Sequence, residues 1–218
     1  MTTGRRRETG TRTLANLARA SQDACVTALR RYGFIAKRRG LLLQRGTSRA
    51  ASGWLGLNLA TWSLPQVLHI NPVVGVRHDT LEAILVSTAG WSAPVASVSR
   101  PLGYLMPQNT FVQWDFSATG DLTAVAEDLA HAVATYGQPF IDHWSDWSTF
   151  SREVASSDLL LDNVRFVMLP AVAAVNGDYE LADQLIRQEL ERTAGEQDAY
   201  SNGYRDFAER FRRTVLTH

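Results

Sequence analysis

The chain has 218 residues, 45% of them hydrophobic and 20% charged, and its 22 basic residues equal its 22 acidic ones in number. These values are typical of a folded chain with one large domain or two small ones, and they exclude a disordered chain. The single cysteine, Cys25, excludes an internal disulfide and a paired-cysteine metal or redox site, and no apolar stretch reaches the roughly 18 residues needed to cross a bilayer.

The chain begins with a basic segment. Residues 1–13 are rich in Gly, Thr and Arg without hydrophobic periodicity, which predicts a mobile basic arm. Residues 1–50 together hold 12 of the 22 basic residues but only two acidic ones, so they carry +10 and residues 51–218 carry −10. From Leu14, apolar residues at helical spacing predict a helix that ends at Gly33 as a left-handed cap, with Cys25 packed in the core.

Strands are predicted next. Leu41–Arg45 is a short apolar run between two glycines, and Trp54–Trp62 alternates leucines with polar or aromatic residues. A third strand is predicted over Val67–Val76, where Pro72 favours an edge strand or a bulge. A short helix from Asp79 or Thr80 to Ser87 follows.

Two further strands, Val95–Met106 and Thr110–Phe116, are predicted on either side of a turn at residues 107–109. The helical period then returns. A helix from Asp121 to Tyr136 is expected to stop at Gly137 and Pro139, and a second helical piece is expected over Ser145–Val154.

The last third of the chain is predicted to be helical, over residues 163–175, 179–193 and 196–216. The segment AVNGDYELADQL between the first two resembles the inter-helix turn of tetratricopeptide-type hairpins. No second copy is visible at a period of about 34 residues, so we expect a lone αα-hairpin. The whole chain is therefore predicted as α+β: an antiparallel sheet of about five strands packed by helices in residues 14–155, and a helical hairpin plus a C-terminal helix in residues 156–218.

Residues 24–144 resemble a group of uncharacterised bacterial α+β domains of unknown function. In that group a helix ending in Gly-Phe leads into a basic turn, a strand carrying Gln and a strand carrying Asn-Leu. The matching positions here are Gly33-Phe34, Lys37-Arg38-Arg39, Gln44-Arg45 and Asn58-Leu59. The segment Asp121–Trp144, in which a helix runs into Tyr-Gly-Gln-Pro-Phe, resembles the group's following helix. The resemblance implies a fold and no established activity.

The basic turn is the strongest candidate binding site. Lys37, Arg38, Arg39 and Arg45 are expected at one end of the sheet with Trp54 or Trp62 nearby, a combination of cations and rings that binds single-stranded nucleic acid or a phosphorylated ligand. The alternative is a solvated loop that pairs with the acidic C-terminal helices. Trp54 and Trp62 lie opposite the leucines in the alternation, so either helices cover both faces of the sheet or these rings line a binding surface.

Catalytic candidates are few. His143 lies between Asp142 and Asp146, which favours either an acid–base or metal role or a polar helix boundary capped by Asp146 or Ser145. Motifs for nucleotide hydrolysis, dinucleotide binding and serine hydrolases are absent from the sequence. We expect no cofactor.

These patterns favour a cytoplasmic, non-enzymatic binding protein without a signal peptide, whose partner is another protein, as in immunity or accessory proteins. Nucleic-acid or phosphate-ligand binding through the arginine-rich patch is the first alternative. A hydrolase or metal-dependent enzyme centred on His143 is the second. The sequence leaves the oligomeric state open.

Overall fold

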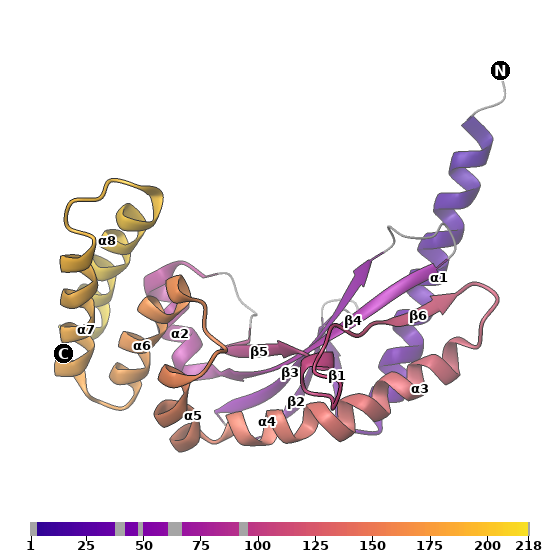
Figure 1. Ribbon diagram of the computed structural model, residues 1–218, viewed down its shortest axis with the longest axis horizontal. Helices are drawn as coiled ribbons and strands as arrows, with labels where there is room; N and C mark the ends of the chain where they lie inside the picture. Colours follow the sequence, from indigo (N-terminus) through magenta and orange to yellow (C-terminus); the bar gives the residue numbers. More distant parts are fainter. Residues whose placement is uncertain (1–3, 38–41, 48–49, 61–66, 92–95, 218) are drawn as a thin grey trace. The chain divides into compact units, whose positions relative to one another are not determined.

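Residues 4–37, 42–47, 50–60, 67–91 and 96–217 are described by the computed structural model shown in Figure 1. The chain divides into two units: unit 1 comprises residues 1–76 and 99–142, and unit 2 comprises residues 77–98 and 143–218. This division differs from the expected boundary after residue 155. Helix α2 (Asp79–Ala89) belongs with the C-terminal helices, because its buried face packs against α6 and α8 of unit 2.

Helix α1 (Gly4–Arg30) of unit 1 begins ten residues before Leu14, the expected start. Residues 4–13, which we expected to be an arm without regular structure, continue the helix toward the N-terminus: no proline interrupts the segment, and its arginines favour a helix although its glycines and threonines do not. The buried positions of α1 include Leu17, Cys25, Ala28 and Leu29, which confirms the apolar spacing. Gly33 has φ +81°, which confirms its left-handed conformation.

The sheet consists of β1 (Ile35–Lys37), β2 (Leu42–Gly46), β3 (Ala51–Ala60), β4 (Val67–His78), β5 (Val98–Pro101) and β6 (Trp114–Ser117). The strands follow the order β1-β2-β3-β4-β5, and β6 also pairs with β4. The pairs β1–β2, β2–β3 and β4–β6 are antiparallel. The predicted α+β class with an antiparallel sheet is confirmed. Strand β1 was not predicted, because three residues are too few to show alternation in the sequence.

For the strand that contains Pro72 the edge alternative was wrong, and so was the expected pairing of the next two strands. Strand β4 lies between β3 and β5, not at the edge, and Pro72, which has no N–H to donate, follows Ile70, the last residue paired with β6. Strands β5 and β6 both pair with β4 and form no hairpin with each other in the described residues. A 3₁₀ turn, η2 (Leu102–Tyr104), interrupts the expected strand. Its Gly103 lies so close to the Thr110 carbonyl that a β-carbon there would be 2.3 Å away.

Helix α3 (Leu122–Ala132) starts as predicted, because the Asp121 side chain accepts hydrogen bonds from the backbone N–H groups of Thr123 and Ala124. The expected stop at Gly137 and Pro139 was wrong. The chain continues through a π-helical turn, η3 (Val133–Gly137), into α4 (Gln138–Ser145), as Figure 1 shows. Pro139 is the second residue of α4 and has no N–H to donate to the π-helical turn directly before it.

The core of unit 1 lies between its helices and the sheet, where α1 packs against α3, β1 and β6. Alternate residues of the strands point into this core, which confirms that one face of β3 is buried. The buried residues of this core include Leu29, Phe34, Leu55, Leu57, Leu68, Ile70, Val74, Phe116, Leu129 and Val133.

Unit 2 is helical. After α2 it contains α5 (Trp147–Glu153), the 3₁₀ turn η4 (Val154–Ser156), α6 (Asp162–Val175), α7 (Tyr179–Arg192), α8 (Ala199–Phe211) and the π turn η5 (Arg212–Leu216). The predicted αα-hairpin is formed by α6 and α7. Gly177 ends α6 with φ +79°, and the Asp178 side chain caps α7 by accepting from Leu181 N–H. Among the described helices, none combines the length and the apolar composition that crossing a membrane requires.

Candidate functional site

The register of β1, β2 and β3 decides which predicted site residues share a face. Gln44 pairs with Ile35 on one side and Trp54 on the other, whereas Arg45 pairs with Gly53. Because neighbouring residues of a strand point to opposite faces, Arg45 and Trp54 lie on opposite faces of the sheet. The expected single patch of Arg45 and Trp54 is therefore not formed.

Lys37 and Trp54 lie on the same face of these strands, opposite to the face of Arg45. Lys37 pairs with Leu42, which pairs with Gly56, two residues from Trp54 on β3. Lys37 is exposed and Trp54 is half-buried. The indole lies over Gly56, where a β-carbon would be 2.7 Å from the ring, so this glycine is what lets the ring lie along the strand.

Arg45 lies on the face opposite to Trp54 and extends toward the end of α1. Its side chain would lie 3.4 Å from a β-carbon at Gly33. Arg38, Arg39 and Trp62, the remaining predicted site residues, lie outside the described residues. Among the predicted site residues that the structure describes, Lys37 and Trp54 share a face.

His143 has a different carboxylate neighbour from the two that the sequence suggested. Its Nε2 lies 3.0 Å from Glu153 Oε2, and both side chains are about half exposed. Asp142 accepts a hydrogen bond from Gln138, while Asp146 caps α5 by accepting from Thr149 N–H. A hydrogen bond from Ser148 lowers the pKa of Asp146 to about 2, with the Thr149 N–H contributing. Asp146 therefore has the capping role that was the alternative for this cluster.

Cys25 is fully buried, and burial raises the pKa of its thiol to about 12. A thiol in this state is a poor nucleophile. The prediction that Cys25 packs in the core is confirmed.

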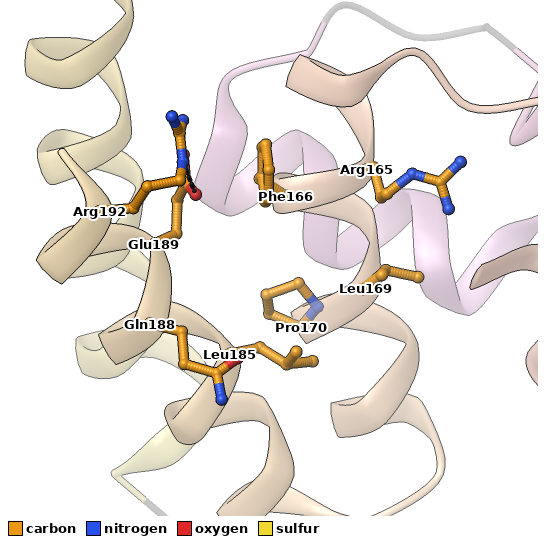
Figure 2. A pocket seen from close by; sticks show the side chains of 8 residues that line it. All are labelled: Arg165, Phe166, Leu169, Pro170, Leu185, Gln188, Glu189 and Arg192. Atoms are coloured by element: carbon orange, nitrogen blue, oxygen red, sulfur yellow. Dashed lines mark hydrogen bonds and ion pairs between the residues drawn. The ribbon is translucent and has the colours of Figure 1, made fainter. Parts of the chain in front are cut away.

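The hairpin of α6 and α7 carries a feature that the sequence analysis did not single out. A pocket of about 200 Å³ lies along it, lined by Arg165, Phe166, Leu169, Pro170, Leu185, Gln188, Glu189 and Arg192. We call it the hairpin groove. Figure 2 shows its two walls: Phe166 and Pro170 of α6 face α7, which presents Leu185, Gln188, Glu189 and Arg192.

Helical spacing builds both walls. The lining residues of α6 are at positions 165, 166, 169 and 170, and those of α7 are at 185, 188, 189 and 192. Residues three or four apart lie on one face of a helix. Pro170 lies inside α6 and has no N–H to donate, so it presents only an apolar ring and a carbonyl. Four of the eight lining residues are apolar, and most of the surface that the groove exposes is apolar.

A paired polar cluster closes one end of the groove. Arg192 donates from Nε and Nη2 to the two oxygens of Glu189, at 2.7 and 2.6 Å, and the Tyr200 hydroxyl donates to Glu189 Oε1 at 2.6 Å. The Arg192 guanidinium also lies 5.1 Å from the centre of the Phe166 ring and 5.9 Å from that of Tyr200. These contacts hold Arg192 in place beside the apolar wall.

Ionisation in this cluster is fixed by the same contacts. Burial raises the pKa of Glu189, but hydrogen bonds from Arg192 and Tyr200 outweigh it, so the pKa lies below its ordinary value. Burial and the hydrogen bond to Glu189 raise the pKa of Tyr200. Glu189 is thus a carboxylate and Tyr200 a neutral donor at neutral pH.

Arg165 lies at the other rim. Its guanidinium donates to the carbonyl oxygens of Ala155, Ser157 and Leu160, so it ties the segment before α6 to that helix. Figure 2 shows its side chain extending away from Arg192. The two arginines of the groove therefore hold the fold, and the space between them is apolar.

No protein-family model matches the chain, and no similar protein was found among curated proteins or solved structures. The family resemblance of residues 24–144 stays a prediction. Within the described ranges, His, Cys, Asp and Glu side chains form no group of three that would hold a metal ion.

Proposed function

We propose that this protein is a non-enzymatic binding protein and that the hairpin groove receives an apolar side chain of another protein. The hairpin groove is the observation that carries this proposal: about 200 Å³ between two helices, with apolar walls and a polar end whose charges are already paired. Pockets for cofactors and drug-sized ligands have about 300–1,000 Å³. A smaller apolar recess suits one anchoring side chain of a partner.

The compartment and the partner class belong to the same proposal. One buried thiol and no disulfide support a reducing compartment such as the cytoplasm. We propose that this chain covers a surface of its partner, as immunity and accessory proteins do, and that the groove anchors one side chain of that surface.

The test is site-specific photo-crosslinking in cells. A photoreactive phenylalanine analogue placed at Gln188, an exposed residue lining the groove, is expected to capture a protein. Leu185→Arg puts a long charged side chain into the groove and is expected to reduce the captured product at least tenfold. Leu181→Arg makes the same change one turn earlier on α7, at an exposed residue outside the groove, and is expected to change little.

Two results would contradict the proposal. One is a cross-linked product that persists in Leu185→Arg at the level seen in Leu181→Arg. The other is capture of nucleic acid in place of protein. Circular dichroism of both variants shows whether the helices remain folded.

A second candidate function is single-stranded nucleic-acid binding by unit 1. The specific observation is that Lys37 and Trp54 share one face of β1 to β3, which combines a cation with a stacking surface. Unit 1 also carries 13 basic and 7 acidic residues, a net charge of +6. The enzyme alternative has no comparable support, because His143 contacts only one carboxylate, Glu153, in the described contacts.

A further inference from the structure

A second pocket of about 200 Å³ lies in unit 2, on the side of α8. It is lined by Ala89, Trp91, Asn163, Val167, Ala199, Tyr200, Gly203, Tyr204 and Phe207, and we call it the aromatic pocket. Four of these residues carry aromatic rings. The rings of Tyr200 and Tyr204 are stacked with centres 6.1 Å apart, and those of Tyr204 and Phe207 are 5.4 Å apart.

Tyr200 connects the aromatic pocket to the hairpin groove. Its ring lines the aromatic pocket, and its hydroxyl donates to Glu189, which lines the groove. Arg192 lies 5.9 Å from the same ring. The two pockets are therefore neighbours, separated by the cluster of Glu189, Arg192 and Tyr200.

The surroundings of the aromatic pocket are acidic. Unit 2 carries 15 acidic and 9 basic residues, a net charge of −6. Exposed Asp162 and Asp198 directly precede the lining residues Asn163 and Ala199. Hydrogen bonds from Ser201 lower the pKa of Asp198, so it is ionised at neutral pH. The residues that line the pocket include no basic side chain.

We infer that the aromatic pocket binds an arginine side chain of the protein partner, next to the apolar side chain in the hairpin groove. A guanidinium is a planar cation that stacks on aromatic faces, and the negative unit attracts it. The same unit already shows this contact between Arg192 and the rings of Phe166 and Tyr200. The inference rests on the proposed function in that both side chains belong to one partner segment.

The basic N-terminal segment of a second copy is a poor occupant for both pockets together. Residues 4–13 hold four arginines but otherwise contain only Gly, Glu and Thr, so they offer no apolar side chain for the groove. The apolar residues that follow include Leu17, which is buried within unit 1. A separate protein with an arginine beside an apolar residue meets both requirements.

Small probes separate the two pockets. The full chain, labelled with ¹⁵N, is titrated by NMR with N-acetyl-arginine amide and, separately, with N-acetyl-leucine amide. The arginine probe is expected to shift the indole signal of Trp91, assigned from its loss in Trp91→Phe. The leucine probe is expected to shift the backbone signals of Leu185 and Gln188. The indole of Trp147, which donates to Asn176 outside both pockets, is the internal control.

Variants then test the contact itself. Trp91→Ala is expected to weaken arginine-probe binding about five- to tenfold, the size of one cation–π contact, while Trp91→Phe keeps a ring and most of the binding. Glu and Gln versions of the probe are expected to bind more weakly than the arginine version. Equal binding of all three probes would overturn the charge argument.

The outcomes distinguish this inference from the proposed function. If the leucine probe shifts the groove signals and the arginine probe leaves Trp91 unchanged, the inference fails and the proposed function stands. If only the arginine probe binds, the groove proposal fails. Concentration-dependent broadening of the Trp91 signal without a probe, abolished by Trp91→Ala, would show that a second copy is the occupant and overturn the assignment to a separate partner.

Discussion

His78 lies among aromatic side chains of unit 2 and is only 3% exposed. Its ring centre is 4.4 Å from that of Phe150 and 5.1 Å from that of Trp147. Nε2 donates to the Trp144 carbonyl at 2.9 Å, and the backbone N–H donates to Ser97 Oγ. Burial lowers the pKa of this imidazole, although Asp79 and Asp146 act in the other direction. The folded state therefore favours neutral His78.

This burial makes unit 2 sensitive to acid. Because the folded pKa lies below the unfolded value of about 6.5, the contribution of His78 is complete above that value and is lost as the pH falls below it. In urea unfolding, we expect His78→Gln, which keeps a donor for the Trp144 carbonyl, to lose less stability than the wild type between about pH 7.5 and pH 5.5. His131→Gln, at an exposed histidine of unit 1, is the control. Parallel pH profiles for wild type and His78→Gln would contradict the prediction.

Glu82 responds to pH with the opposite sign to His78, which is why a variant comparison is needed. Its side chain is fully buried, Oε1 accepts from Ser97, and Oε2 lies 3.6 Å from Arg77 Nη1. Burial raises its pKa despite these two neighbours. Its contribution is complete below the unfolded pKa and is lost as the pH rises through the folded one. The stability of the wild type therefore contains two pH-dependent contributions of opposite sign. Only the difference between the wild type and His78→Gln isolates the contribution of His78.

At the scale of elements, the continuous run of α3, η3 and α4 depends on Gly137. A β-carbon at this position would be 2.9 Å from Val74 Cγ1 and 3.3 Å from Leu102 Cδ1, so the glycine lets the π turn approach β4 and η2. We expect Gly137→Ala to destabilise the protein by about 1–3 kcal/mol through overpacking. Gly203→Ala is the matched change, since a β-carbon there meets no atom within 4 Å and α8 gains about 0.5–1 kcal/mol from the better helix former.

Thermal or denaturant unfolding of the two alanine variants measures these effects. Opposite signs are expected. A Gly137→Ala protein as stable as the wild type would show that the neighbouring side chains move aside, and that close packing is not what selects glycine there.

The same elements show what the sequence can and cannot predict. Local chemistry is sufficient for helix starts, because Asp121 and Asp178 accept hydrogen bonds from the N–H groups directly after them. It also predicts the αα-hairpin and the buried face of β3. It fails at Gly137, where a distant contact with Val74 overrides a local stop signal. It fails again at β5 and β6, whose partner is β4 and not the strand nearest in sequence.

The hairpin groove could not be predicted from the sequence for a related reason. Helical spacing puts Phe166, Pro170 and Leu185 on facing sides of the hairpin, but buried core residues and the walls of an open groove have the same spacing. Within the predicted basic–aromatic site, strand register separates Arg45 from Trp54, and Arg38, Arg39 and Trp62 lie outside the described residues. Arg45 and Trp54 point to opposite faces because Arg45 pairs with Gly53, and that pairing is invisible in composition.

At the scale of the whole molecule, the charge segregation seen along the sequence follows the two units. Unit 1 carries +6 and unit 2 carries −6, so the net charge of zero is a sum of two strongly charged parts. Salt screens such charges over about 10 Å at 0.1 M. Each unit can thus attract ligands of opposite sign, a basic partner segment for unit 2 and a polyanion for unit 1.

The second candidate function predicts a specific response to salt. Fluorescence anisotropy with a labelled oligothymidylate at low ionic strength is expected to detect binding whose log K falls with log salt by about 0.7 per neutralised phosphate. Changing Arg5, Arg6 and Arg7 together to Gln is expected to reduce that slope by up to about 2, because three cations leave the positive unit.

Trp54→Ala is expected to cost about 1–3 kcal/mol of binding free energy if bases stack on its ring over Gly56. Trp91→Ala, in the negative unit, should leave the affinity unchanged. An oligonucleotide that fails to bind at low salt would remove this candidate, and an affinity that depends on the arginines but not on Trp54 would reduce it to unspecific attraction.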